Sequence, residues 1–513
     1  MRLSQPFVLL AAATGVLSYA VELPAGVPRS LLEFREKHPY TAASDGCRKT
    51  IQIRASSNDI DDVSEEFRKG MEEANNGGTL YLPKGKTFVI AKALDLTFLN
   101  DVHVHLEGEI KFTNDVKYWQ ENAFTHPFQR SIMFWKWGGK DIKIYGDGVI
   151  NGQGQRWWDE FNAGIGSILL TPRPQNPDNK YLRPILFYVE NTTNLEVHGI
   201  HMKDSPCWTN FVVGSSNIEY KDVIATAITN NGSIIPKNTD FFDSLDVQDV
   251  RIERVWVNID DDCFSPKSNN TNLYVNTMYC NGTHGQSIGS LGQYPGEMSF
   301  VKDVHIENVW MLNGDVGPLA KTFPRRSMRL TNVQYSGARI KTWAGPNVGY
   351  GYVENITYKN FWLARMDYGI ILDSCYFNVR HPSTPFPPSA IPRNRTSILT
   401  ETNKINETTC EQYPSGMNVS NVSFENFSGY TSGIYGNAVA KLTCSTNPDA
   451  VCHNIKIKDF NVTSPCGGEP VVICDGIDGE LGIPCVSIDS EEAKTALAAK
   501  CQTPLAPIDT NPW

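Results

Sequence analysis

Residues 249–275, DVRIERVWVNIDDDCFSPKSNNTNLYV, contain the same short unit twice. One copy begins at Asp249 and the other begins at Asn272, 23 residues later. Each copy starts with Asp or Asn and then alternates apolar with polar residues, which is the pattern of a short strand with one buried face. Single strands that recur at a long period indicate a solenoid, in which each coil stacks on its neighbours.

The same unit recurs along most of the chain, which favours one extended solenoid. A β-sandwich or a propeller also contains many short strands, but those folds need hairpin turn signals, and none recurs between these strands. We therefore predict an all-β fold, a right-handed parallel β-helix. Further copies of the unit begin at Asp141, Asn194, Asn217, Asp303, Asn355, Asn421 and Asn454.

A short helix is expected to cap the first coil. Residues 58–76 place Val63, Phe67, Met71 and Ala74 at helical spacing behind a start rich in Asn and Asp. The open end of a solenoid exposes apolar side chains, so this helix is predicted to cover that end as an N-terminal cap.

The N-terminus has the composition of a secretory signal peptide at residues 1–20, with a basic start at Arg2, an apolar run and a small-x-small cleavage site. We further predict an N-terminal leader at residues 21–55, a parallel β-helix catalytic domain at residues 56–500 and a C-terminal tail at residues 501–513. No later apolar run reaches the roughly 18 residues that span a bilayer. The expected product is secreted and extracellular, with no membrane partner.

Cysteines and glycosylation sequons agree with export. The chain has 12 cysteines and eleven Asn-x-Ser/Thr sequons. Disulfides are the default state of cysteines in an oxidising compartment. The connectivity stays open, although Cys263 and Cys280 are close enough in sequence to join neighbouring coils, and the six cysteines between Cys444 and Cys501 suggest a cross-linked C-terminal end.

The net charge of the chain limits the kinds of partner that it is expected to bind. The formal net charge is −10 and the sequence pI is about 5.6. No block of Lys and Arg appears, so nucleic acid is not an expected partner. A polyanionic substrate requires local cations or an acid medium, and activity is expected to peak in mildly acid medium. No pattern indicates an oligomer, so a monomer is expected.

Two insertions interrupt the strand pattern. Residues 381–397 are rich in proline and are expected to form a surface loop. Residues 315–335 contain a basic run between Lys321 and Arg329 and interrupt what is otherwise a continuous coil. This second insertion is interpreted either as a loop on the substrate side or as an intron translated in a gene model.

Three polar stretches in the middle of the chain are spaced like successive coils. Residues 238–240 (Asn-Thr-Asp) and 261–263 (Asp-Asp-Cys) place their first aspartates 21 residues apart, and His284 follows Asp261 by 23 residues. Stacked strands lie roughly 4.8 Å apart, so Asp240, Asp261, Asp262 and His284 are predicted to converge. Hydrolysis of a glycosidic bond needs one carboxylic acid and one carboxylate, and repulsion among three aspartates raises the pKa of at least one of them. The alternative is a solvated turn.

Arg339 and Lys341 point the same way if they lie on a strand, because residues i and i+2 share a face. Such a pair of cations can clamp a substrate carboxylate. A solvated strand face is the alternative. No cofactor or metal site is predicted, since no Cys/His quartet has metal-ligand spacing and the aspartates suit acid–base chemistry better than a calcium site.

Four motifs together resemble the polygalacturonases of glycoside hydrolase family 28, especially the fungal exopolygalacturonases. The motifs are residues 238–240, residues 261–263, residues 284–290 and residues 339–341, and the likeness extends from the capping region to the strands near residue 454. The resemblance implies a right-handed parallel β-helix and an inverting hydrolase that needs no metal.

The resemblance also implies roles for eight residues. By motif these are Asp261, the general acid; Asp240 and Asp262, which activate the water; His284, which supports the acid; and Arg339, Lys341, Tyr376 and Asn238, which bind the substrate.

Two departures from the family pattern point to the exo-acting branch. Phe241 and Thr283 stand where the family commonly has glycine. Bulky residues and loop insertions near a site can close one end of its cleft. The resemblance therefore implies an exopolygalacturonase, a galacturonan 1,4-α-galacturonidase that removes galacturonic acid from the non-reducing end of polygalacturonic acid or pectin.

Other functions remain open at this point. Within the family these are an exo-acting hydrolase of rhamnogalacturonan or xylogalacturonan and an endopolygalacturonase. A pectate or pectin lyase shares the architecture but forms an unsaturated product. From a different class, a β-helix can be a non-catalytic glycan-binding protein, since fold does not fix function.

Overall fold

The computed structural model describes residues 27–40, 46–163, 182–232, 234–314, 334–376, 410 and 412–501. The predicted signal peptide, residues 315–333 of the basic insertion, the proline-rich insertion and residues 502–513 of the predicted tail lie outside the described residues. No helix among the described residues is both long and apolar enough to cross a membrane.

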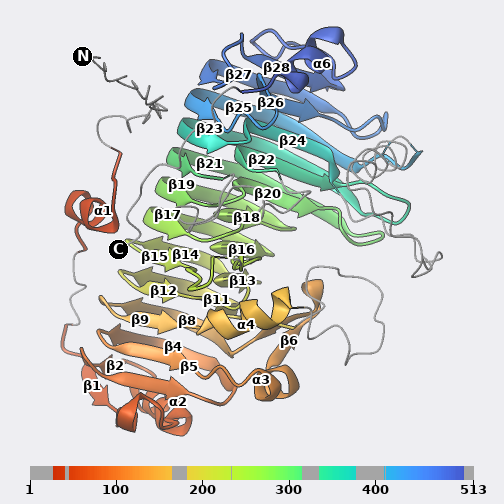
Figure 1. The fold of residues 1–513 in the computed structure, drawn as a ribbon. Helices are drawn as coiled ribbons and strands as arrows, with labels where there is room; N and C mark the ends of the chain where they lie inside the picture. The colour runs from red at the N-terminus through yellow and green to blue at the C-terminus, as the bar shows by residue number, and fades with distance from the viewer. Residues whose placement is uncertain are drawn as a thin grey trace, which may run out of the picture.

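The described residues form a parallel β-helix, as predicted. Twenty-six strands join one sheet, and the neighbouring strands of successive coils pair in parallel. Figure 1 shows the coils stacked from the red N-terminal end to the blue C-terminal end. Because each coil contacts only the next, residues far apart in sequence recur side by side along the stack.

The coil has three faces. The face called the site sheet from here on consists of β13 (Asn210–Val213), β16 (Phe242–Leu245), β18 (Phe264–Pro266), β20 (Gln286–Leu291), β22 (Ser336–Trp343), β24 (Tyr368–Tyr376), β26 (Ala438–Thr443) and β28 (Val471–Asp475). The strands beside it, most of them long, are β1 (Lys49–Gln52), β2 (Gly78–Leu82), β4 (Leu94–Leu106), β8 (Trp135–Tyr145), β11 (Phe187–His198), β14 (Ser216–Lys221), β17 (Val247–Asn258), β19 (Asn270–Asn281), β21 (Met298–Leu312), β23 (Tyr350–Met366), β25 (Gly416–Thr431), β27 (Cys452–Thr463) and β29 (Ile477–Asp478). In the first coils the third face consists of β3 (Thr87–Ile90), β5 (Glu109–Phe112), β9 (Val149–Asn151), β12 (His201–Lys203) and β15 (Ile224–Thr226).

The remaining elements are short. A small sheet contains β6 (Phe124–His126), β7 (Ser131–Met133) and β10 (Pro184–Ile185). The helices are α1 (Leu31–Lys37), α2 (Ser64–Ala74), α3 (Val116–Asn122), α4 (Gly154–Asn162) and α6 (Glu491–Ala498), with 3-10 turns η1 (Ser57–Asp59) and η2 (Phe128–Arg130). The predicted leader thus contains α1 and β1, and β1 already pairs with β2.

The Asn or Asp that opens each repeat has a structural reason. These residues have a left-handed backbone, with φ of 59° at Asp249 and 57° at Asn272. Asn and Asp tolerate this conformation better than other residues with a side chain. Asn272 Nδ2 donates to Asp249 Oδ1 at 2.5 Å, and Asn217 Nδ2 donates to Asn194 Oδ1 at 2.7 Å. The repeated Asn or Asp therefore marks a backbone bend in each coil, and side-chain hydrogen bonds join these bends into a ladder.

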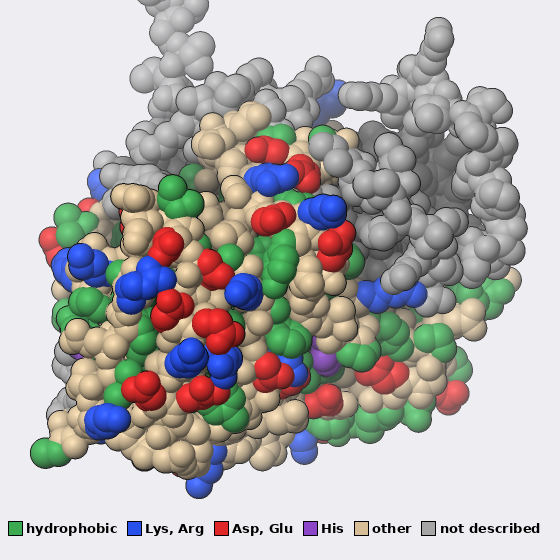
Figure 2. Space-filling model, turned by 90° about the horizontal axis from the view of Figure 1, so that it is seen from below, with side chains coloured by type: hydrophobic (Ala, Val, Ile, Leu, Met, Phe, Trp, Pro, Cys, Tyr) green, Lys and Arg blue, Asp and Glu red, His purple; other side chains and the backbone are tan. Residues whose placement is uncertain are grey.

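The predicted cap is α2, which is shorter than residues 58–76. Val63, Phe67, Met71 and Ala74 are fully buried and belong to the main apolar core, which continues through the interior of the coils. Figure 2 views this end of the molecule and shows Asp and Glu side chains mixed with Lys and Arg. The cap thus covers the apolar end of the stack and presents a charged surface to the solvent.

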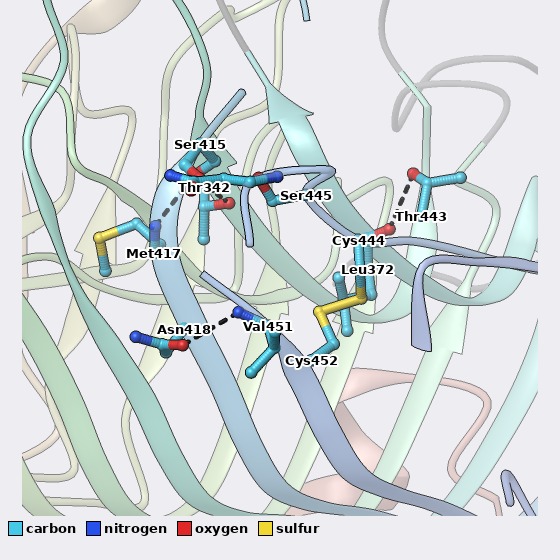
Figure 3. Close-up of a disulfide and its surroundings, with 11 residues drawn as sticks. Thr342, Leu372, Ser415, Met417, Asn418, Thr443, Cys444, Ser445, Val451 and Cys452 are labelled. Carbon is cyan, nitrogen blue, oxygen red and sulfur yellow. Dashed lines mark hydrogen bonds between the residues drawn. A yellow bond between two sulfur atoms is a disulfide. The ribbon is translucent and has the colours of Figure 1, made fainter. Parts of the chain in front are cut away.

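Ten of the 12 cysteines are paired. Cys263–Cys280 joins neighbouring coils as expected, and the six C-terminal cysteines form the expected cross-linked end. Figure 3 shows Cys444–Cys452, beside which Asn418 accepts a hydrogen bond from the Val451 amide. The pairs are Cys263–Cys280, Cys375–Cys410, Cys444–Cys452, Cys466–Cys501 and Cys474–Cys485, whereas Cys47 and Cys207 are free thiols.

The outward side of the site sheet changes character along the stack. Tyr188 pairs with Phe211, Phe211 with Asp243, and Asp243 with Ser265, so one row runs from aromatic to polar residues. The aromatic half packs under residues 124–133, which we call the arm. Its buried cluster contains Phe128, Met133, Ile185, Tyr188, Cys207, Trp208, Phe211 and Leu245. The polar half begins at Asp243.

Candidate active site

The three polar stretches stack on adjacent coils. The Phe241 amide donates to the Asp262 carbonyl, the His284 amide to the Asp261 carbonyl and the Cys263 amide to the Gly285 carbonyl, each at 2.9 Å. These bonds place Asp240, Asp261, Asp262 and His284 together at the edge of the site sheet, and all four are buried.

Asp261 forms an ion pair with His284. Nδ1 of His284 lies 2.9 Å from Oδ1 of Asp261, and Asn238 Nδ2 donates to the other oxygen at 3.3 Å. Burial by itself raises the pKa of Asp261, but the His284 imidazolium outweighs it and holds that pKa well below its ordinary value. Burial lowers the pKa of His284, and the Asp261 carboxylate reverses this effect, so the net shift is upward.

Asp262 is surrounded by donors. Ser287 Oγ donates to Oδ1 at 2.6 Å, and Lys341 Nζ donates to Oδ2 at 2.5 Å. Burial favours the neutral form, but the ammonium of Lys341 lowers the pKa of Asp262. Asp262 is therefore held as a carboxylate, the form that a general base requires.

Asp240 is held in the opposite state. Its Oδ1 has no hydrogen-bond partner among the described residues. Burial and the nearby carboxylate of Asp261 raise the pKa of Asp240 well above its ordinary value. The predicted repulsion thus raises one pKa, but it does so at Asp240, whereas the proton was expected on Asp261. The expectation did not include the imidazolium of His284 as a charged partner of Asp261.

The two cations of the predicted clamp lie side by side. Arg339 and Lys341 are both buried on β22, and their charged groups lie 5.6 and 5.4 Å from the ring centroid of Tyr376. Tyr376 is half-buried on the neighbouring strand β24. Arg339 also donates to the Gln334 carbonyl at 2.9 Å. The predicted site residues are thus grouped around one polar patch.

Asp261, Asp262 and His284 resemble a metal site, but each of the two carboxylates already faces a cation of the protein. Ligand atoms of Asp261, Asp262 and His284 lie within 4.8 Å of one another. The imidazolium of His284 faces Asp261, and the ammonium of Lys341 faces Asp262. We therefore interpret this trio as an acid–base group.

Sequence reasoning missed four residues that surround the aspartates. Asp243, Ser265, Lys267 and Ser287 are all buried. The Lys267 ammonium lies 2.9 Å from Asp243 Oδ1, and burial raises the pKa of Asp243 to about 7 despite this partner. A sequence pattern could have found two of them, because Ser265 and Lys267 stand at positions i and i+2, the same spacing that singled out Arg339 and Lys341.

The clustered carboxylates are those that a glycoside hydrolase requires, and a pair of cations lies on the same sheet. Residues 76–337 match the family model described as glycosyl hydrolases family 28. A probable exopolygalacturonase B of Neosartorya fischeri is 47% identical over 462 residues, which cover 90% of this chain and 88% of the relative. A probable exopolygalacturonase B of Emericella nidulans is 46% identical over 92% of this chain and 93% of the relative.

Solved structures agree on the fold. The endo-xylogalacturonan hydrolase of Aspergillus tubingensis is 27% identical, with a TM-score of 0.66, over 85% of this chain and 99% of that one. The hyperthermoactive exopolygalacturonase of Thermotoga maritima has the same fold, with a TM-score of 0.54 at 17% identity, over 87% of this chain and 95% of that one. The chain belongs to glycosyl hydrolase family 28.

Proposed function

We propose that this protein is an exopolygalacturonase, which removes galacturonic acid units from the non-reducing end of polygalacturonic acid or pectin with inversion. One observation carries the proposal: the acid–base cluster and the Arg339–Lys341 pair occupy a polar patch that ends directly against the covered aromatic half of the site sheet. The similarity to relatives named exopolygalacturonase supports the same activity.

The arm supports exo action because it crosses the site sheet beside the cluster. The Gln129 amide donates to the Tyr294 hydroxyl at 2.8 Å, although 165 residues separate the two. The Phe128 ring lies 5.7 Å from the Tyr294 ring and 6.2 Å from the Trp208 ring. Tyr294 follows β20, the strand next to His284. A wall at this place lets the end of a polysaccharide chain bind at the catalytic residues, but it prevents the chain from extending past them.

The cavity that the described residues form beneath the arm is too small for a sugar. A cavity of about 20 Å³ lies between the arm and the site, with Arg183, Trp208 and Asn238 in its lining. A volume of this size accommodates about one water molecule. The terminal sugar therefore has to bind on the polar side of this wall.

The protonation states suggest a division of labour. In the free enzyme the proton of the Asp261–His284 pair resides on the imidazole. During the reaction His284 passes this proton to Asp261, Asp261 delivers it to the leaving glycosidic oxygen, and His284 is left neutral. Asp262, held ionised by Lys341, removes a proton from the attacking water. Asp240 contacts the same water and carries its own proton in the free enzyme. These roles satisfy the requirement for one acid and one base.

The remaining site residues match the negative charge of the proposed substrate. Arg339 and Lys341 offer two cations to the galacturonate carboxylate, and Tyr376 and Asn238 flank the same patch. Hydrolysis of xylogalacturonan is the second candidate, since the structural relative with a TM-score of 0.66 bears that name. A non-catalytic glycan-binding protein would not need ionised and protonated carboxylates side by side.

The proposal includes secretion as a monomer. The signal-like residues 1–20 and the five disulfides both suit an oxidising compartment.

A substrate panel tests this function. The purified protein is incubated with polygalacturonate, rhamnogalacturonan and xylogalacturonan, and the released sugars are separated and quantified. We expect rapid release of galacturonic acid from polygalacturonate and no ultraviolet-absorbing unsaturated product. Faster hydrolysis of xylogalacturonan would show that xylogalacturonan, not polygalacturonate, is the substrate. An unsaturated product would show that the reaction is an elimination and not a hydrolysis.

A further inference from the structure

Lys267 is a buried cation that none of the predicted roles uses. It follows β18 directly and is 5% exposed. Its Nζ lies 2.9 Å from Asp243 Oδ1, 2.5 Å from Ser265 Oγ and 3.2 Å from the Gly289 carbonyl oxygen. A buried ammonium is costly unless such partners surround it. Its position beside the catalytic carboxylates therefore calls for a reason.

Ser265 connects Lys267 to the proposed base. The hydroxyl of Ser265 accepts the hydrogen bond from Lys267, so its own hydrogen must point at another acceptor. The two acceptors within reach are Asp262 Oδ2 at 3.3 Å and the Gly289 carbonyl at 2.8 Å. The Gly289 carbonyl is the nearer acceptor and also accepts from Lys267, so Lys267 holds the Ser265 hydroxyl in place between this carbonyl and the base.

The two lysines of the site lie on either side of β20. Gly289 of β20 pairs with Lys341 of β22, and the same Gly289 carbonyl accepts from Lys267 on the β18 side. Asp262 therefore has one ammonium in direct contact and a second one linked through a serine. This arrangement places positive charge on both sides of the carboxylate.

The other charges around Lys267 are mainly acidic. Asp243 and Asp240 face it from β16 and the residues before it, Asp262 from the turn before β18, and Lys341 from β22. Burial lowers the pKa of Lys267, but Asp243 and Asp240 raise it further, so the ammonium persists. Because the pKa of Asp243 is about 7, the Asp243 carboxyl is largely neutral in mildly acid medium. The charge of Lys267 then acts on the catalytic aspartates.

We propose that Lys267 is a positioning residue of this active site, which holds Ser265 against Asp262 and supplies a fixed positive charge that keeps the base ionised. The proposal rests on the proposed function, because it assigns Lys267 to the same hydrolytic site. Lys267 itself need not touch the sugar.

Three variants separate this role from simple structural support. Lys267→Met removes the cation and keeps much of the side-chain volume, Lys267→Arg keeps the cation, and Asp243→Asn removes the ionisable carboxyl beside Lys267 while leaving the lysine in place. The pH dependence of kcat/KM is measured for each, and circular dichroism confirms folding.

Loss of the cation should move the acidic limb of the profile of Lys267→Met to higher pH by on the order of one unit, because a nearby opposite charge lowers a carboxyl pKa by roughly that much or more. Asp243→Asn should leave that limb within a few tenths of a unit of the wild type, since Asp243 is already largely neutral there. Lys267→Arg should move it back toward the wild type. An unshifted limb in Lys267→Met, or an equal upward shift in Asp243→Asn, would overturn the proposal.

A second readout does not depend on the substrate. Without Lys267, the folded-state pKa values of the buried aspartates rise further, so the melting temperature of Lys267→Met should fall more steeply from mildly acid to neutral pH than that of Asp243→Asn. Equal slopes would also overturn the proposal. If the wild type fails to release galacturonic acid, the proposed function fails by itself, and these slopes still test the charge of Lys267.

Discussion

The two halves of the site sheet have the same backbone and opposite surfaces. In one row, Tyr188 and Phe211 lie under the arm, whereas Asp243 and Ser265, the next residues in register, open the polar patch. The parallel pairing continues without interruption from one half to the other. The backbone of the solenoid therefore does not determine the site. The outward residues of successive coils do, together with the segment that covers them.

The comparison explains how one fold can give two modes of attack on a polymer. An uncovered sheet offers a continuous groove, in which a long chain can lie across the catalytic residues. Here the arm meets Tyr294 across the sheet and covers the aromatic half, whereas the described residues of the arm leave the polar half uncovered. Exo action then follows from the place where the aromatic half ends.

The largest effect is expected at the acid in the polar half. Asp261→Asn keeps the size of the side chain but removes the group that donates the proton, and general acid catalysis contributes roughly 10²–10⁴-fold in rate. We expect kcat to fall by about this factor while the circular dichroism spectrum stays unchanged. Asp303→Asn, an exposed position in the Asn/Asp ladder, is the matched control and should retain full activity. Wild-type activity in Asp261→Asn would disprove the assignment of the acid.

Opening the aromatic half should change the products. Phe128 is buried between the Trp208 and Tyr294 rings, and truncation of such a phenylalanine costs about 3–5 kcal/mol of local packing. Phe128→Ala should loosen the arm and let oligomers appear beside galacturonic acid in a digest. Phe98→Ala, at a residue 40% exposed, is the control. If limited proteolysis shows a loosened arm and the digest still contains the monomer alone, the arm does not enforce exo action.

A smaller effect is expected at Tyr376. Its ring lies against the charged groups of Arg339 and Lys341, and such contacts contribute about 0.5–2 kcal/mol. Tyr376→Ala should raise KM by about fivefold with a smaller change in kcat, because the clamp loses its support. Tyr376→Phe keeps the ring and should resemble the wild type. The same loss in both variants would mean that the hydroxyl group, not the ring, matters.

The smallest effect concerns stability. Burial raises the pKa of Asp260 from 3.8 to about 7. For a carboxyl whose folded-state pKa is raised, the stability is fully present below the unfolded pKa and is lost as the pH rises through 7. The wild type should therefore melt at lower temperature in neutral than in mildly acid medium. Asp260→Asn should reduce the difference in melting temperature between the two pH values by a few degrees, as measured by calorimetry. An unchanged difference would contradict the raised pKa of Asp260.

Much of the fold could be predicted because the repeat has a local cause. A left-handed bend such as that at Asn272 favours Asn or Asp in every coil, so the pattern survives in a single sequence. Stacking then brought residues 240, 261, 262 and 284 together, as their spacing predicted. Cys263 and Cys280 were close enough in sequence to join neighbouring coils, and the structure pairs them.

The rest depended on contacts that spacing does not encode. Closure of the cleft was expected from bulky residues such as Phe241 and Thr283 and from loop insertions, but both side chains are fully buried. The contact that holds the arm across the sheet is the Gln129–Tyr294 bond between distant segments. No role was predicted for Lys267 or Asp243, although both are buried and form an ion-pair contact beside the aspartates. The state of Asp261 depended on His284 as a charged partner at 2.9 Å, which a list of acidic residues does not reveal.

The most direct test of exo action at a walled polar site is a time course of polygalacturonic acid digestion, followed by proton NMR of the released sugars. The structure predicts galacturonic acid alone from the earliest points, first in the inverted anomeric form. A ladder of oligomers at early times would contradict the wall formed by the arm, and a retained anomer would contradict the roles given to Asp261 and Asp262.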